Sequence, residues 1–126
     1  MSTEYAHVGV VAPETIVRDV SIAPLTTLEL GGSAAFLVEV ERPADAIEAV
    51  RWARGCSLPL LVLGGGSNLV VADEGWPGLV IRVAMHGIEM DRRGDEVLVT
   101  ASAGESWDTF VEAMVEADLA GLECLG

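Results

Sequence analysis

Short apolar runs alternate with stretches of helical spacing along most of this chain. The runs are bounded by turn-forming residues and are predicted as strands at 36–40, 60–63, 79–83, 88–91 and 97–101. The helical stretches are predicted at 44–54 and 106–118. Residues 16–22 fit either a short helix or an extended segment. The pattern therefore predicts a fold that mixes strands and helices, with a strand, a helix and a strand as its first unit.

Both predicted helices have recognisable ends. Pro43 occupies the expected first helical position, where a backbone N–H would have no partner within the helix, so proline costs no hydrogen bond there. Gly55 follows the last helical turn. Ser106 is the expected N-cap of the second helix. On the first helix, the apolar residues Ile47, Val50 and Ala53 fall on one side. On the second, one apolar stripe is expected to face the core: Trp107, Phe110, Val111, Met114 and Val115. Turns are expected at 73–78 and 92–95.

The most distinctive stretch follows the apolar run 60–63. It consists of Gly64, Gly65 and Gly66, followed by Ser67 and Asn68. Consecutive glycines let another group approach the main chain closely, and successive N–H groups can form a concave anion site. The residues suit a phosphate or diphosphate held by main-chain amides, but they suit a plain turn between strands equally well.

Two familiar phosphate loops fit this stretch poorly. The P-loop needs a lysine after its last glycine, and this chain contains no lysine. The dinucleotide-binding fingerprint needs a further glycine that opens a helix, whereas residues 67–70 resemble a strand. A second glycine pair, Gly31 and Gly32, follows Thr26 and Thr27 and marks another turn or close approach.

Composition narrows the possible ligands. The chain has 126 residues, enough for one modest core, and a net charge of −13 from 20 acidic residues against 7 arginines. Nucleic acids and anionic membrane surfaces need a positive field, so neither is an expected partner. An anionic ligand would have to be held by local dipoles in a screened pocket.

Other features predict no further chemistry. The chain has no apolar run near the ~20 residues of a membrane span and no signal peptide, so a cytoplasmic protein is expected. Cys56 and Cys124 are isolated, which indicates neither a metal site nor a redox pair. His7 is expected in a solvated tail and His86 in a structural role, because no metal-ligand spacing surrounds it.

Several segments taken together resemble one enzyme family. They occur in the same order and at similar intervals: Thr26-Thr27, Gly31-Gly32, 61–69, 78–81, Ala101 to Trp107 and Gly121-Leu122-Glu123. This series resembles the N-terminal part of the UDP-N-acetylenolpyruvoylglucosamine reductases (UDP-N-acetylmuramate dehydrogenases), members of the vanillyl-alcohol-oxidase (VAO/PCMH) FAD-binding superfamily. The resemblance extends over roughly 21–126.

The resemblance implies an α+β fold in which FAD lies between two small subdomains. It assigns the cofactor's diphosphate to Gly64, Gly65, Gly66, Ser67 and Asn68, and places Thr27 near the flavin. The implied subdomains are 21–72 and 73–126, after an N-terminal tail at 1–20, with the second subdomain incomplete. In the family's reaction, NADPH reduces the flavin, which passes a hydride to the enolpyruvyl double bond of the sugar nucleotide.

The family's catalytic serine, arginine and glutamate, and its substrate domain, fall beyond this chain. No residue here is therefore expected to be catalytic, and the chain alone is expected to be an inactive fragment that binds FAD weakly. Two other readings stay open. One is the FAD domain of another oxidoreductase of this superfamily, acting on a hydroxy acid or alcohol. The other is a non-enzymatic binding module in which the glycine stretch is only a turn.

Overall fold

The computed structural model describes residues 12–65 and 69–122, which divide into two compact units. The first unit extends to Ala84 and the second begins at Met85. The sequence placed this boundary between residues 72 and 73. The difference arises because residues 76–83 form a strand inside the sheet of the first unit, with a neighbour on each side.

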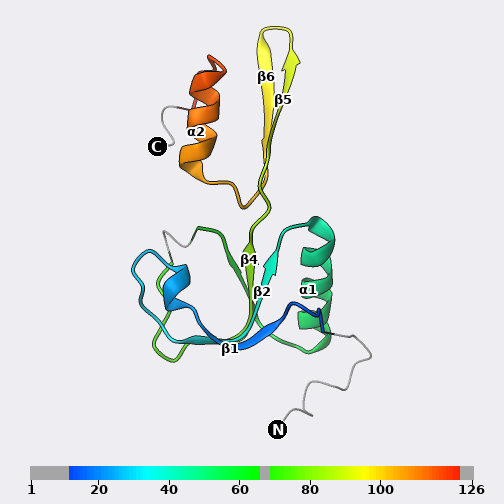
Figure 1. The fold of residues 1–126 in the computed structure, drawn as a ribbon. Coiled ribbons are helices and arrows are strands. Elements are labelled where there is room, and N and C mark those ends of the chain that lie inside the picture. The colour runs from blue at the N-terminus through cyan, green and yellow to red at the C-terminus, as the bar shows by residue number, and fades with distance from the viewer. Residues whose placement is uncertain (1–11, 66–68, 123–126) are drawn as a thin grey trace. The chain divides into compact units, whose positions relative to one another are not determined.

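The first unit is a four-stranded sheet with a helix on one face (Figure 1). Its strands are β1 (Val17–Ser21), β2 (Ser33–Val40), β3 (Leu60–Leu63) and β4 (Trp76–Val83), in the spatial order β1-β2-β4-β3. β1 runs antiparallel to β2, while β2, β4 and β3 are parallel. The extended alternative for residues 16–22 is thus correct, and part of the expected tail at 1–20 belongs to the sheet.

One face of the sheet is covered by α1 (Pro43–Gly55), which contacts β2 and β4. The Phe36 ring meets the Trp52 ring edge-on, with centroids 5.1 Å apart. The buried residues of α1 are Ala49, Trp52 and Ala53. Ile47, on the apolar side predicted for this helix, is nevertheless 51% exposed. The bulky Trp52 occupies the contact with β2 instead.

The opposite face carries a second apolar cluster. Its buried members are Ile22, Ala34, Leu63, Val71 and Val80, and Leu25, Leu37, Leu61, Leu69 and Trp76 pack against them. The short 3-10 helix η1 (Ala23–Leu25) lies on the other side of the strands from α1 (Figure 1). Leu69 and Val71, which follow β3 in the chain, therefore lie on the face that α1 leaves free.

The second unit contains a hairpin and one helix. β5 (Ile88–Arg93) pairs antiparallel with β6 (Glu96–Ala101). The expected turn at 92–95 shortens to Gly94 and Asp95, because Arg92 and Arg93 are paired in β5. Gly94 has φ +66°, the left-handed conformation that glycine adopts without strain.

The helix α2 (Trp107–Glu116) begins where the sequence predicted. The Ser106 hydroxyl accepts a hydrogen bond from the Thr109 amide at 3.3 Å, which confirms the N-cap. Its apolar stripe is only partly covered: Met114 is buried and Phe110 half-buried, but Val115 is 68% exposed. The described part of this unit offers only a two-stranded hairpin, which is too small to cover the whole stripe. Neither α1 nor α2, the α-helices in the part of the chain that the structure describes, could span a membrane.

Candidate functional site

The carboxyl ends of β2, β4 and β3 meet at one edge of the sheet because the three strands are parallel. The chain leaves β2 toward α1 on one face. It leaves β3 toward residues 69–71, of which Leu69 and Val71 pack in the cluster on the other face. In open α/β sheets, connections that depart to opposite faces leave a crevice at the carboxyl edge where ligands bind. Gly64 and Gly65 stand at this edge.

Gly64 and Gly65 lie just outside the sheet. The pairing of β3 with β4 ends at Leu63, and both glycines are exposed. Within the described part of the chain, neither glycine amide donates a hydrogen bond. A Cβ built at either position would meet no atom of the described residues within 4 Å, and neither φ lies in the left-handed range. Neither crowding nor backbone conformation among the described residues therefore calls for glycine here. The opening they leave fits a close-approaching external group.

Other glycines of the first unit are explained by close packing against other segments of this chain. A Cβ at Gly32 would collide with the Asp73 carbonyl oxygen, and one at Gly75 with the Ser33 carbonyl oxygen. Gly31 has φ +121° and would place a Cβ 2.7 Å from the Cβ of Val71. The pair Gly31 and Gly32 thus allows close contact between two segments of this chain. No ligand is needed to account for it.

The two threonines of the Thr26-Thr27 pair, of which Thr27 is predicted to lie near the flavin, have different environments. Thr26 is buried, and its hydroxyl donates a hydrogen bond to the Ala23 carbonyl at 3.2 Å. Thr27 is exposed. Leu25 packs against the same cluster as Leu63, the residue before Gly64. The segment that carries Thr27 and the strand that leads to the glycines are therefore both anchored in this cluster. Gly66, Ser67 and Asn68, also predicted to bind the cofactor, lie outside the described residues.

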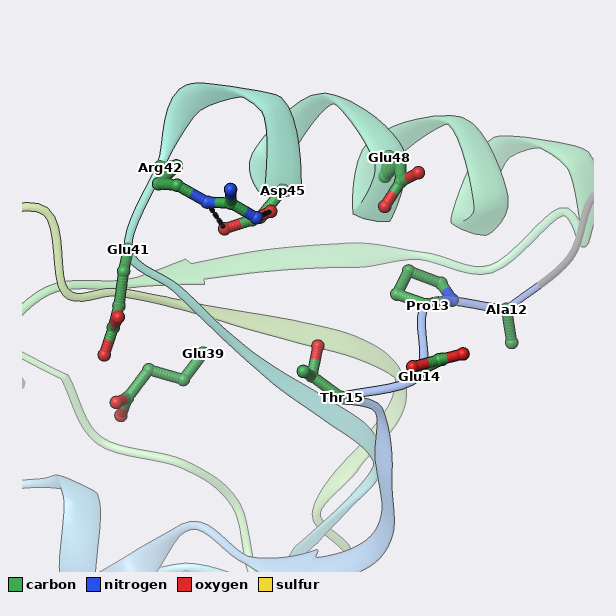
Figure 2. A pocket seen from close by; sticks show the side chains of 9 residues that line it. All are labelled: Ala12, Pro13, Glu14, Thr15, Glu39, Glu41, Arg42, Asp45 and Glu48. Carbon is green, nitrogen blue, oxygen red and sulfur yellow. Dashed lines mark hydrogen bonds and ion pairs between the residues drawn. The ribbon is translucent and has the colours of Figure 1, made fainter.

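A separate pocket of about 790 Å³ lies between the N-terminal segment and the start of α1 (Figure 2). Its ionisable lining residues are Glu14, Glu39, Glu41, Arg42, Asp45 and Glu48. Arg42 is engaged by Asp45 through two hydrogen bonds, of 2.7 and 3.1 Å. This pairing raises the pKa of Arg42 and lowers that of Asp45. So much negative charge disfavours an anionic cofactor in this pocket. The carboxyl edge of the sheet at Gly64 and Gly65, called the glycine edge below, is the better candidate for a cofactor site.

His86 has an acidic neighbour that its sequence surroundings did not reveal. Glu105 Oε1 lies 3.8 Å from His86 Nδ1, and Oε2 accepts a hydrogen bond from the Gly87 amide at 2.9 Å. The Gly87 bond, helped by a bond from the Ser106 amide and by His86, holds the pKa of Glu105 below its usual range. No three His, Cys, Asp or Glu side chains gather as metal ligands in the part that the structure describes. Cys56 is half-buried; His7 and Cys124 lie outside the described residues.

Two curated proteins that are similar to this chain are reductases. A UDP-N-acetylenolpyruvoylglucosamine reductase of Saccharopolyspora erythraea is 51% identical over 106 residues, covering 83% of this chain and 29% of that protein. The reductase of Streptomyces avermitilis is 45% identical over 108 residues, covering 86% of this chain and 29% of its own length. The chain therefore spans less than a third of these two curated relatives.

A solved structure agrees with these sequence relatives. The crystal structure of UDP-N-acetylenolpyruvylglucosamine reductase (MurB) from Thermus caldophilus matches with a TM-score of 0.59 and 32% identity. The match covers 87% of this chain and 36% of that one, and it confirms the predicted fold class. The model of the FAD binding domain family matches residues 34–125, most of the chain. This chain therefore belongs to the FAD binding domain family.

Proposed function

We propose that this chain is the FAD-binding part of a reductase that converts UDP-N-acetylenolpyruvoylglucosamine to UDP-N-acetylmuramate in peptidoglycan synthesis, with NADPH as reductant. The observation that carries the proposal is the high identity to such reductases across most of this chain. In the whole enzyme, the partners are FAD, NADPH and the sugar nucleotide. The family match to an FAD binding domain supports the first of these.

The residues proposed to hold the cofactor are those at the carboxyl edge of β3. Gly64 and Gly65 present amides with no acceptor among the described residues, and no described atom lies within 4 Å of a Cβ built on either. We assign the diphosphate to these two glycines together with Gly66, Ser67 and Asn68, and place Thr27 nearer the flavin. Main-chain dipoles suit this task because the chain's net charge of −13 repels a diphosphate at long range.

Bound FAD would supply the hydride chemistry of the reaction, since flavins carry that capacity themselves. The contribution of this chain is to bind the cofactor and fix its orientation. We assign no residue of this chain a catalytic role.

Substitution of Gly65 by valine tests the site. The valine side chain would fill the open space over the glycine, where a phosphate is proposed to approach. We expect the FAD dissociation constant of Gly65→Val to rise about tenfold or more, a loss of about 1.4 kcal/mol in binding free energy. The fluorescence change of FAD during titration with the purified chain measures this.

Gly94→Asn is the matched control. Gly94 also has open space around it but lies in the hairpin turn, and asparagine tolerates its left-handed conformation. Its FAD affinity should equal that of the unaltered chain. Equal affinity of Gly65→Val would contradict the site, and absence of FAD binding by the unaltered chain would contradict the proposed function.

A further inference from the structure

Arg82 lies in β4, the strand that pairs with β3. Its partner in β3 is Leu63, the residue before Gly64. Its register partner in β2, on the other side, is Glu39. Side chains in one such row of a parallel sheet point to the same face. Leu63 belongs to the cluster opposite α1, so Arg82 is on that face too, beside the residue that precedes Gly64.

The guanidinium of Arg82 is accessible to solvent, and its ion pair with Glu39 is exposed and weak. Its Nη1 donates a hydrogen bond to Glu39 Oε2 at 2.9 Å, and both side chains are 45% exposed. Figure 2 shows the Glu39 side chain leaving β2 on the side away from α1. Exposed ion pairs are worth about 0–1 kcal/mol, so an incoming phosphate can compete for this arginine.

The other arginines described in the first unit have different settings. Arg18 lies over the Phe36 ring, 5.5 Å from its centroid, and Arg42 is paired with Asp45. Arg51 and Arg54 belong to α1, on the opposite face of the sheet. Among the described residues of this unit, Arg82 is thus the arginine that pairs in the sheet next to Gly64 and points to the face opposite α1.

We propose that Arg82 binds the diphosphate of the cofactor, adding a charged donor to the amides of Gly64 and Gly65. The proposal rests on the proposed function. Arginine presents a planar fork of N–H donors that matches phosphate oxygens, and such charge-assisted hydrogen bonds are among the stronger ones in proteins. Glu39 holds the side chain at the carboxyl edge in the free protein and competes with the phosphate for it.

The experiment is an FAD titration of the 126-residue chain at several salt concentrations. Arg82→Gln should raise the dissociation constant about tenfold or more, the effect of losing a hydrogen bond to a charged group, and should weaken its dependence on salt. Arg51→Gln removes the same charge from α1 and should change affinity less than about twofold. Glu39→Gln removes the competitor and should lower the dissociation constant. Circular dichroism of each variant checks its fold.

The outcomes separate this inference from the proposed function. If the unaltered chain binds FAD and Arg82→Gln matches Arg51→Gln in affinity and salt dependence, Arg82 has no contact with the diphosphate. If Glu39→Gln weakens binding, the competition between Glu39 and the cofactor is disproved. If the unaltered chain binds no FAD, both the inference and the proposed function are overturned.

Discussion

Glu105 shows how one side chain ties together main-chain segments that are distant in sequence. Its carboxylate accepts hydrogen bonds from the Gly87 amide at 2.9 Å and the Ser106 amide at 3.1 Å, and its side chain is only 12% exposed. The ionised form makes these bonds, which is why its pKa is lowered. The carboxylate therefore stabilises the segment before β5 against the start of α2.

Glu105→Gln should loosen this contact at neutral pH, because an amide nitrogen would face one of the two N–H donors. A lowered folded-state pKa means that the stabilisation is present above the unfolded pKa, about 4.3, and is lost as pH falls through the folded value. We expect a lower protection factor for Gly87 amide exchange in the variant at pH 7, and a smaller difference at about pH 3.

Glu112→Gln, an exposed site on α2, is the control and should leave Gly87 protection unchanged. A difference between Glu105→Gln and the unaltered chain that grows on acidification would contradict this account.

At the scale of elements, the contact between β3 and β4 depends on a glycine that has no room for a side chain. Gly78 is buried, and a Cβ there would collide with the Pro59 carbonyl oxygen. That carbonyl accepts the hydrogen bond from the Leu79 amide at 2.9 Å that begins the pairing. β3 lies at the edge of the sheet, so its pairing with β4 fixes the position of the glycine run that follows it.

Gly78→Ala should lower the free energy of unfolding by about 1–3 kcal/mol, the typical cost of overpacking. Gly64→Ala makes the same chemical change where no described atom lies within 4 Å of the new Cβ, and should change stability by less than about 0.5 kcal/mol. Urea unfolding of the two variants measures the contrast. Equal stabilities would show that Gly64 is as constrained by the fold as Gly78.

At the scale of the whole molecule, the chain forms two units and spans about 29% of the Saccharopolyspora erythraea and Streptomyces avermitilis reductases. Its proposed task is limited to holding the cofactor, because the resemblance assigns the catalytic serine, arginine and glutamate to other parts of the family's sequence.

We therefore expect the FAD-loaded 126-residue chain to show no substrate-dependent oxidation of NADPH. The measurement is the decrease in NADPH absorbance after addition of UDP-N-acetylenolpyruvoylglucosamine. The full-length Saccharopolyspora erythraea reductase, assayed in parallel, shows that the reagents are active. Turnover by this chain that depends on the sugar nucleotide would contradict the expectation.

Elements with strong local signals were predictable from the sequence. Pro43 and Gly55 bounded α1 to within a residue at each end, and Ser106 marked the start of α2. The strand at 60–63 was predicted with the bounds it has in the structure. Each of these depends on neighbours in the chain, through periodicity, capping or turn residues. The predicted roles of Gly64 to Asn68 and of Thr27 remain proposals.

The sequence by itself determined where this chain forms helices and strands, because hydrophobic period and end residues act over a few positions. Only the tertiary structure decided that β4 lies between β2 and β3, since strand order depends on contacts between distant segments. That order moved the unit boundary to Ala84 and set Arg82 beside Leu63. It also separated the crowded glycines, such as Gly32 and Gly78, from the open Gly64 and Gly65. A Cβ is excluded by atoms brought in from elsewhere in the chain, and no local pattern records them.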